Sequence, residues 1–162
     1  MLRIIKILLI LAVASWGFIA ALQNLIDWQG TLGAIGAATS MATFEGGVDS
    51  WQAASNSLLI WLGAVFIVVS KLASGALCLA GSRQMWRARR AGTAEFQRSK
   101  DLALSGCAIS ILMLFGGFVV IAETWFELWR SDVLRGPVLD SAFHYGGMIA
   151  LIALFVGSPD EL

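Results

Sequence analysis

A single lysine inside a long apolar run is the residue with the clearest chemical potential in this sequence. Lys71 is the one charge in residues 57–81. An ionised amine at the centre of a bilayer costs between about 3 and 10 kcal/mol, so it marks a function or a partner. We expect either a transport or proton-transfer role, or a structural role. In the structural role Lys71 is neutral, snorkels toward the cytoplasm or contacts a carboxylate of a partner subunit.

Two carboxylates near the end of a later apolar run form the second candidate site. Glu123 and Glu127 are spaced i, i+4, which places both on one face of a helix, where they could bind a cation or act as acid and base. The alternative is an interfacial anchor in which Glu127 bonds to Arg130 at i, i+3. Glu123 is not expected to reach Lys71, because at about 1.5 Å rise per residue their backbones are offset by about 15 Å along the membrane normal.

His144 and Tyr145 open the last apolar run and are weak candidates for cofactor binding. They could bind a quinone headgroup, or haem with a ligand from another chain, and the alternative is a local hydrogen bond. The sequence has no other histidine, and Cys78 and Cys107 lie inside apolar runs rather than in a spaced motif. We therefore expect no metal site, no cofactor and no disulfide.

A cluster of arginines follows residues 57–81 and could contact lipid headgroups. It comprises Arg83, Arg87, Arg89 and Arg90. Each basic residue near an anionic membrane surface contributes about 1 kcal/mol of attraction. The same cluster also serves to orient the protein in the membrane.

The elements that must position these residues are membrane-spanning helices. The chain has 162 residues, 58% hydrophobic and 14% charged, with a mean hydropathy of +0.79, which suits a bilayer better than water. A helix needs about 20 apolar residues to cross the hydrocarbon core. Four such runs occur, at about residues 4–26, 57–81, 102–125 and 141–157. We predict an all-α fold with a single domain, a bundle of four transmembrane helices over residues 1–162.

The first run has a second interpretation as a cleavable signal peptide. Arg3 and Lys6 precede it, and residues 12–14, Ala-Val-Ala, resemble a cleavage site. The run continues well past Ala14, which favours a retained span.

The distribution of basic residues predicts the orientation. Residues 82–101 are rich in arginine and lysine and are expected in the cytoplasm, together with the N-terminus and the C-terminus. The links 27–56 and 126–140 are then outside. Five tryptophans that prefer a membrane interface fall near that outer side: Trp28, Trp51, Trp61, Trp125 and Trp129.

The two outer links are expected to be irregular. Residues 27–56 are rich in glycine, alanine, serine and threonine and look like a loop lying on the membrane surface. In the second link Gly136 and Pro137 are expected to stop the chain before Asp140 or Ser141 caps the last helix.

Small residues recur at four-residue spacing in all four runs, which allows close helix packing in lipid. The pairs are Gly17 and Ala21, Ser70 and Ser74, Gly106 and Ser110, and Gly146 and Ala150. Because these faces exceed what one four-helix bundle needs, we expect a second membrane subunit or a homo-oligomer.

Several short motifs resemble the bacterial family of predicted small integral membrane proteins known as domain of unknown function 2165. The motifs are Asn24-Leu25 with Asp27, Ser40-Met41 with Thr43, Leu77-Cys78 with Gly81, Phe96 with Lys100, and Gly117-Phe118 followed by Glu123, Trp125-Phe126 and Trp129. The resemblance implies four spans and a bacterial inner membrane, without a known activity, cofactor or substrate. The site of Lys71 is usually acidic in that family, so a shared charge-dependent mechanism is not implied.

The sequence favours a non-catalytic protein. It has no nucleophile motif, phosphate-binding loop or basic groove for nucleic acid, and its net charge is zero. Our first hypothesis is an accessory or assembly subunit of an inner-membrane complex. The alternatives are a small transporter or ion-coupled protein that uses Lys71, and a redox protein that binds haem or quinone near His144.

Overall fold

Four long apolar helices make up most of the chain. The computed structural model describes residues 1–160, and all regular secondary structure within them is helical. Four helices are long and apolar enough to cross a membrane: Leu2–Ile26, Ser57–Ala88, Thr93–Trp125 and Arg135–Gly157. The predicted all-α fold with four membrane-spanning helices is confirmed.

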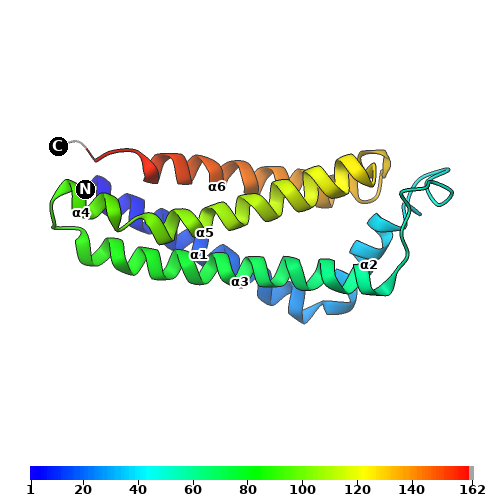
Figure 1. The fold of residues 1–162 in the computed structure, drawn as a ribbon, viewed down its shortest axis with the longest axis horizontal. Coiled ribbons are helices and arrows are strands. Elements are labelled where there is room, and N and C mark those ends of the chain that lie inside the picture. Colours follow the sequence, from blue (N-terminus) through cyan, green and yellow to red (C-terminus); the bar gives the residue numbers. More distant parts are fainter. Residues whose placement is uncertain (161–162) are drawn as a thin grey trace.

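The helices form an elongated bundle with two different ends (Figure 1). In chain order the elements are α1 (Leu2–Ile26), α2 (Trp28–Thr39), α3 (Ser57–Ala88), α4 (Thr93–Arg98), α5 (Asp101–Ile111), the π-helix η1 (Leu112–Trp125), the 3-10 helix η2 (Leu128–Arg130), the π-helix η3 (Arg135–Asp140) and α6 (Ser141–Gly157). Helix α1 packs on α3, α3 on α5, and α5 on α6. The N-terminus, α4 and residues 158–160 lie at one end, which we call the basic end, and α2 with residues 40–56 lies at the other, which we call the loop end.

Small residues allow the helices to approach closely from the middle of the bundle toward the basic end. Gly17 of α1 faces Gly75 of α3, and a Cβ added to Gly17 would lie 2.8 Å from the carbonyl oxygen of Lys71. Gly81 of α3 lies so close to Ala103 of α5 that an added Cβ would overlap the Ala103 backbone. In lipid this close packing replaces the hydrophobic driving force.

Most of the predicted small-residue faces are used inside the chain. The buried members are Gly17, Ala21, Ser70, Ser74, Gly106 and Ser110. Gly146 and Ala150 on α6 are half-buried. The expected surplus of such faces is therefore wrong, because three of the four pairs are buried within the bundle.

Serine hydroxyls join α3 to α5 in the core. Ser74 Oγ donates to the carbonyl oxygen of Gly106 at 2.7 Å, and it lies 2.6 Å from Ser110 Oγ. Cys78 and Cys107 flank this contact as free, buried thiols. These bonds satisfy polar groups that could not find water in the membrane.

A helix replaces part of the predicted first loop. We expected residues 27–56 to be irregular, but α2 occupies residues 28–39. Asp27 caps this helix by accepting a hydrogen bond from the amide of Gly30 at 3.0 Å, and Thr31 bonds back to α1. The expectation is wrong for these residues because a side-chain cap and a tertiary contact outweigh the low helix propensity of their glycines.

The second link also differs from the prediction. Helix η3 runs through Pro137 directly into α6, and neither Asp140 nor Ser141 caps α6 through its side chain. The predicted stop is wrong, because proline is tolerated in the first turn of a helix, where its missing amide would have no partner.

Candidate functional site

A cavity of about 660 Å³ lies in the half of the bundle nearer the loop end. Helices α1, α2, α3, η1, η3 and α6 all contribute to its wall. The wall is mainly apolar, with aromatic rings from Trp16, Phe66, Phe118, Phe126 and Tyr145. Trp16 and Tyr145 contact each other, with ring centroids 5.5 Å apart. A volume between about 300 and 1,000 Å³ is typical of sites for small molecules.

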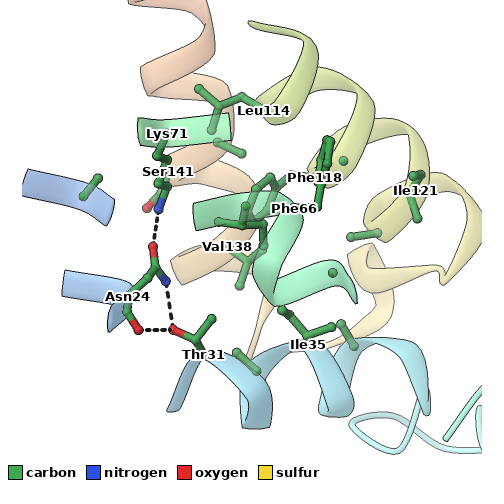
Figure 2. Close-up of a pocket in the computed structure, with 18 of the residues that line it drawn as sticks. Asn24, Thr31, Ile35, Phe66, Lys71, Leu114, Phe118, Ile121, Val138 and Ser141 are labelled. Atoms are coloured by element: carbon green, nitrogen blue, oxygen red, sulfur yellow. Dashed lines mark hydrogen bonds between the residues drawn. The ribbon is translucent and has the colours of Figure 1, made fainter. Parts of the chain in front are cut away.

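Lys71 lies at the inner end of this cavity, near the middle of α3 (Figure 2). Its backbone faces Gly17. Its side chain extends toward the loop end, where Nζ donates to Asn24 Oδ1 at 2.5 Å. Asn24 Nδ2 donates in turn to Thr31 Oγ1 at 2.9 Å, and that hydroxyl donates to the Asn24 carbonyl at 3.2 Å. The alternative in which Lys71 snorkels toward the basic end is therefore wrong.

The amine of Lys71 has no acidic partner in the described part of the chain. None of the cavity-lining residues is aspartate or glutamate, and none of the ion pairs within residues 1–160 includes Lys71, so Glu123 does not pair with it. An ammonium group has three donors, and the structure shows a single hydrogen bond, to Asn24. Lys71 can therefore donate to an acceptor that enters the cavity.

The predicted shared face of Glu123 and Glu127 is wrong. Helix η1 ends at Trp125, and Glu127 has a left-handed backbone with φ 49° and ψ 36°. The two carboxylates are therefore not on one helix. Glu127 instead contacts Arg130 at 2.8 Å, which is the contact expected for an interfacial anchor.

The structure separates the two predicted cofactor candidates. Tyr145 lines the cavity, whereas His144 is exposed and is not part of its wall. Within residues 1–160 no group of three or more histidine, cysteine, aspartate or glutamate side chains could hold a metal ion. Tyr145 is therefore the member of this pair that can contact a molecule in the cavity.

The arginine cluster lies at the basic end, where α3 ends. Arg83, Arg87 and Arg90 are exposed. Arg89 is half-buried over the ring of Trp86, 4.1 Å from its centroid, and donates to the Trp86 carbonyl at 2.7 Å. Three of the four arginines are thus exposed, and their contact with lipid headgroups stays a prediction.

A buried ion cluster joins three parts of the chain at the basic end. Lys6 of α1 and Lys100, which precedes α5, have fully buried side chains, and both contact the carboxylate of Asp160, at 3.1 and 2.6 Å. Both amines also donate to the Ser158 carbonyl, at 2.8 and 2.9 Å. Lys100 donates further to Gln97 Oε1 at 2.7 Å. The cluster fastens the segment after α6 to α1 and α5.

The environment of Asp160 favours its charged form. Burial opposes ionisation of this carboxyl, but the hydrogen bond from Lys100 and the positive charges of Lys100 and Lys6 outweigh it and hold the pKa of Asp160 below its ordinary value. The cluster therefore stabilises the fold while Asp160 is ionised.

Sequence reasoning missed the partners in both polar sites. Asn24 interrupts the first apolar run, and an amide side chain inside a span was the signal that could have identified it. Lys6 was interpreted only as an orienting charge, and Asp160 was not singled out. Nothing in their spacing indicates that residues 6, 100 and 160 meet, because three helices must first assemble.

Comparison with known proteins identifies one family. The profile of the family described as predicted small integral membrane protein (DUF2165) matches residues 2–159. No curated protein and no solved structure matches the chain. Residues of the motifs that resemble this family have structural roles in this chain: Asp27 caps α2, Gly81 permits the α3–α5 contact, and Lys100 lies 5.2 Å from the ring centroid of Phe96.

Proposed function

Since this chain belongs to the family of predicted small integral membrane proteins, whose description names no activity, we propose from its geometry that it binds an amphipathic molecule within the membrane. The observation that carries this proposal is the 660 Å³ cavity with Lys71 at its inner end. Aromatic and aliphatic walls suit the apolar body of a ligand, and a single donor group fixes its orientation. A polar group at this depth is retained where it has a function.

Transport is a second candidate, and the asymmetry of the bundle favours it. The cavity lies toward the loop end, whereas the half nearer the basic end is closed by close helix contacts and by the Lys6–Lys100–Asp160 cluster. A transporter that is open toward one side has this arrangement, with its binding site near the middle of the bilayer. Lys71 would then be the intramembrane group that meets the cargo.

The accessory-subunit hypothesis has less support. It depended on small size, on the scarcity of polar groups in the spans and on small-residue faces in excess of those needed for one bundle, and most of these faces are buried inside the chain. Small size and the scarcity of polar groups are the arguments that remain for it. A stoichiometric partner after purification in mild detergent would favour this role over ligand binding.

We further propose that the protein lies in the bacterial inner membrane with its basic end in the cytoplasm. The four apolar helices require a bilayer. The arginines at positions 83, 87, 89 and 90 all lie at the basic end, and basic residues are retained on the cytoplasmic side. Accessibility of single cysteines introduced at two exposed positions, Val48 near the loop end and Gly92 at the basic end, tests this orientation.

Filling the cavity tests the binding function. Ala122 of η1 lines the cavity, so the ring added by Ala122→Phe should occupy part of it. The amount of amphipathic molecule that co-purifies with the protein, measured by native mass spectrometry, should fall at least fivefold. The matched control is Ala76→Phe, which adds the same ring to an exposed position of α3 and should leave the bound molecule unchanged. A wild-type protein that retains no molecule and gains no thermal stability from any added amphiphile would contradict the proposal.

A further inference from the structure

The ligand class follows from the charge of the cavity, and this step rests on the proposed binding function. We infer that the cavity takes a single-chain amphipathic monoanion of the fatty carboxylate class, with its carboxylate on Lys71 and its chain along the aromatic wall. Nothing in the family description assigns a ligand.

The first argument is charge complementarity. Lys71 is bonded to the neutral oxygen of Asn24, and no acidic residue lines the cavity. A charged amine without a counter-ion is costly at mid-membrane, and so is a carboxylate. Placed together they neutralise each other, and a hydrogen bond between two charged groups is about twice as strong as a neutral one. The ligand thus supplies the charge that the protein lacks.

The second argument is the donor geometry around Lys71. Asn24 Oδ1 uses one donor of the amine, and Asn24 Nδ2 is already directed to Thr31. Two donors of the ammonium group remain for a ligand. They suit the two oxygens of one carboxylate, whereas a dianionic phosphate would remain half neutralised by a single lysine.

The third argument is size. Lys71 and Leu59 both line the cavity on α3 and are twelve positions apart, which at about 1.5 Å per residue gives a length of about 18 Å. One acyl chain covers half of the hydrocarbon core, or about 15 Å. The cavity therefore matches one extended chain in length. The aromatic rings of Trp16, Phe66 and Phe118 provide a wall along this path.

Bound in this direction, the ligand is inverted relative to a lipid of the adjacent leaflet. Its carboxylate lies near the bilayer centre and its chain points toward the loop end. A free fatty acid does not keep its charge at that depth, because the cost of an isolated ion there is several kcal/mol. Occupancy of the cavity must therefore depend on the charge of Lys71.

Two photoreactive probes of equal chain length test this inference, a diazirine fatty acid and the corresponding fatty alcohol. Each is added to the full-length protein in nanodiscs, and labelled peptides from α1, η1 and α6 are quantified by mass spectrometry. The acid should label these peptides at least tenfold more in the wild type than in Lys71→Met, whereas labelling by the alcohol should fall by less, because a hydroxyl loses a hydrogen bond but no charge pair. Lys71→Arg should retain labelling by the acid.

A second variant tests the charge argument without removing the lysine. Asn24→Asp is nearly isosteric and supplies the missing counter-ion to Lys71, so it should lower labelling by the acid at least tenfold and lower labelling by the uncharged alcohol by less. The thermal transition of each variant, followed through the buried thiols of Cys78 and Cys107, identifies any variant that fails to fold.

The outcomes separate the ligand class from the binding function. If acid and alcohol label the cavity equally in the wild type, Lys71→Met and Asn24→Asp, the anion assignment is overturned and the binding function stands. If a folded Lys71→Met loses both probes, charge is not what selects the ligand, and the assignment is again overturned. If neither probe labels the cavity in the wild type, the proposed function itself fails.

Discussion

Replacing Asp160 with asparagine removes the carboxylate that two buried ammonium groups share. Lys6 and Lys100 lie 3.1 and 2.6 Å from its oxygens. At an effective dielectric constant of about 20, each contact has a Coulomb energy of roughly 5–6 kcal/mol. Desolvation offsets most of this, and removing one partner of a buried ion pair costs about 3–5 kcal/mol. We expect a loss of about 3 kcal/mol, because Ser158 still accepts from both amines.

For a chain of this length a loss of about 3 kcal/mol corresponds to a decrease in Tm of roughly 6–12 °C. The protein contains its own reporter, since Cys78 and Cys107 are fully buried free thiols that react with a maleimide dye only after unfolding. A thermal ramp in detergent with this dye measures the shift. Asp132→Asn is the matched control, because Asp132 is exposed and its Tm should change by less than about 2 °C.

The double variant Asp160→Asn with Lys6→Met distinguishes charge from packing. Removing one of the two ammonium groups relieves their repulsion, so the double variant should regain part of the lost Tm relative to Asp160→Asn. A Tm within about 2 °C of the wild type for Asp160→Asn would refute the reasoning, because the cluster would then contribute no more than an exposed ion pair.

Two further predictions concern the pH dependence and the helix contacts. The depressed pKa of Asp160 means that its stabilisation is fully present above the ordinary value of about 3.8 and is lost as pH falls through the lower folded value. The Tm of the wild type should therefore fall more steeply below pH 4 than that of Asp160→Asn, and parallel curves would contradict this. Gly81→Ala should lower the Tm by the equivalent of about 3 kcal/mol or more, because its Cβ overlaps the Ala103 backbone. Gly147→Ala on α6, where a Cβ meets nothing within 4 Å, should leave the Tm unchanged or raise it slightly.

Hydropathy predicts the spans because the bilayer acts on each helix independently. The apolar runs of α1 and α3 are long enough to be recognised without knowledge of any contact. The depth of Lys71 was predictable for the same reason. The short contact between Glu127 and Arg130 followed from local spacing alone.

The remaining features depend on assembly or on local backbone geometry. Asn24 meets Lys71 across 47 positions, which requires the packing of α1 on α3. The left-handed backbone of Glu127 breaks the i, i+4 pattern, and it could not be predicted because glutamate is not a residue type that favours a positive φ. Asp27 is a residue type that caps helices, but the sequence did not indicate that a helix begins after it, because the glycines of α2 obscured the helical pattern.

The contact between Gly17 and Gly75 lies between the cavity and the ion cluster. Helix α1 can therefore tilt as a rigid body about this contact, so that its two ends move in opposite directions. Asn24 is seven residues from Gly17 and Lys6 is eleven residues away in the other direction, giving arms of about 10 and 16 Å. By the ratio of these arms, a tilt that moves Asn24 by about 2 Å moves Lys6 by about 3 Å in the opposite direction. That displacement equals the 3.1 Å separation of Lys6 and Asp160. A molecule that widens the cavity would thereby pull on the ion cluster at the far end of the bundle.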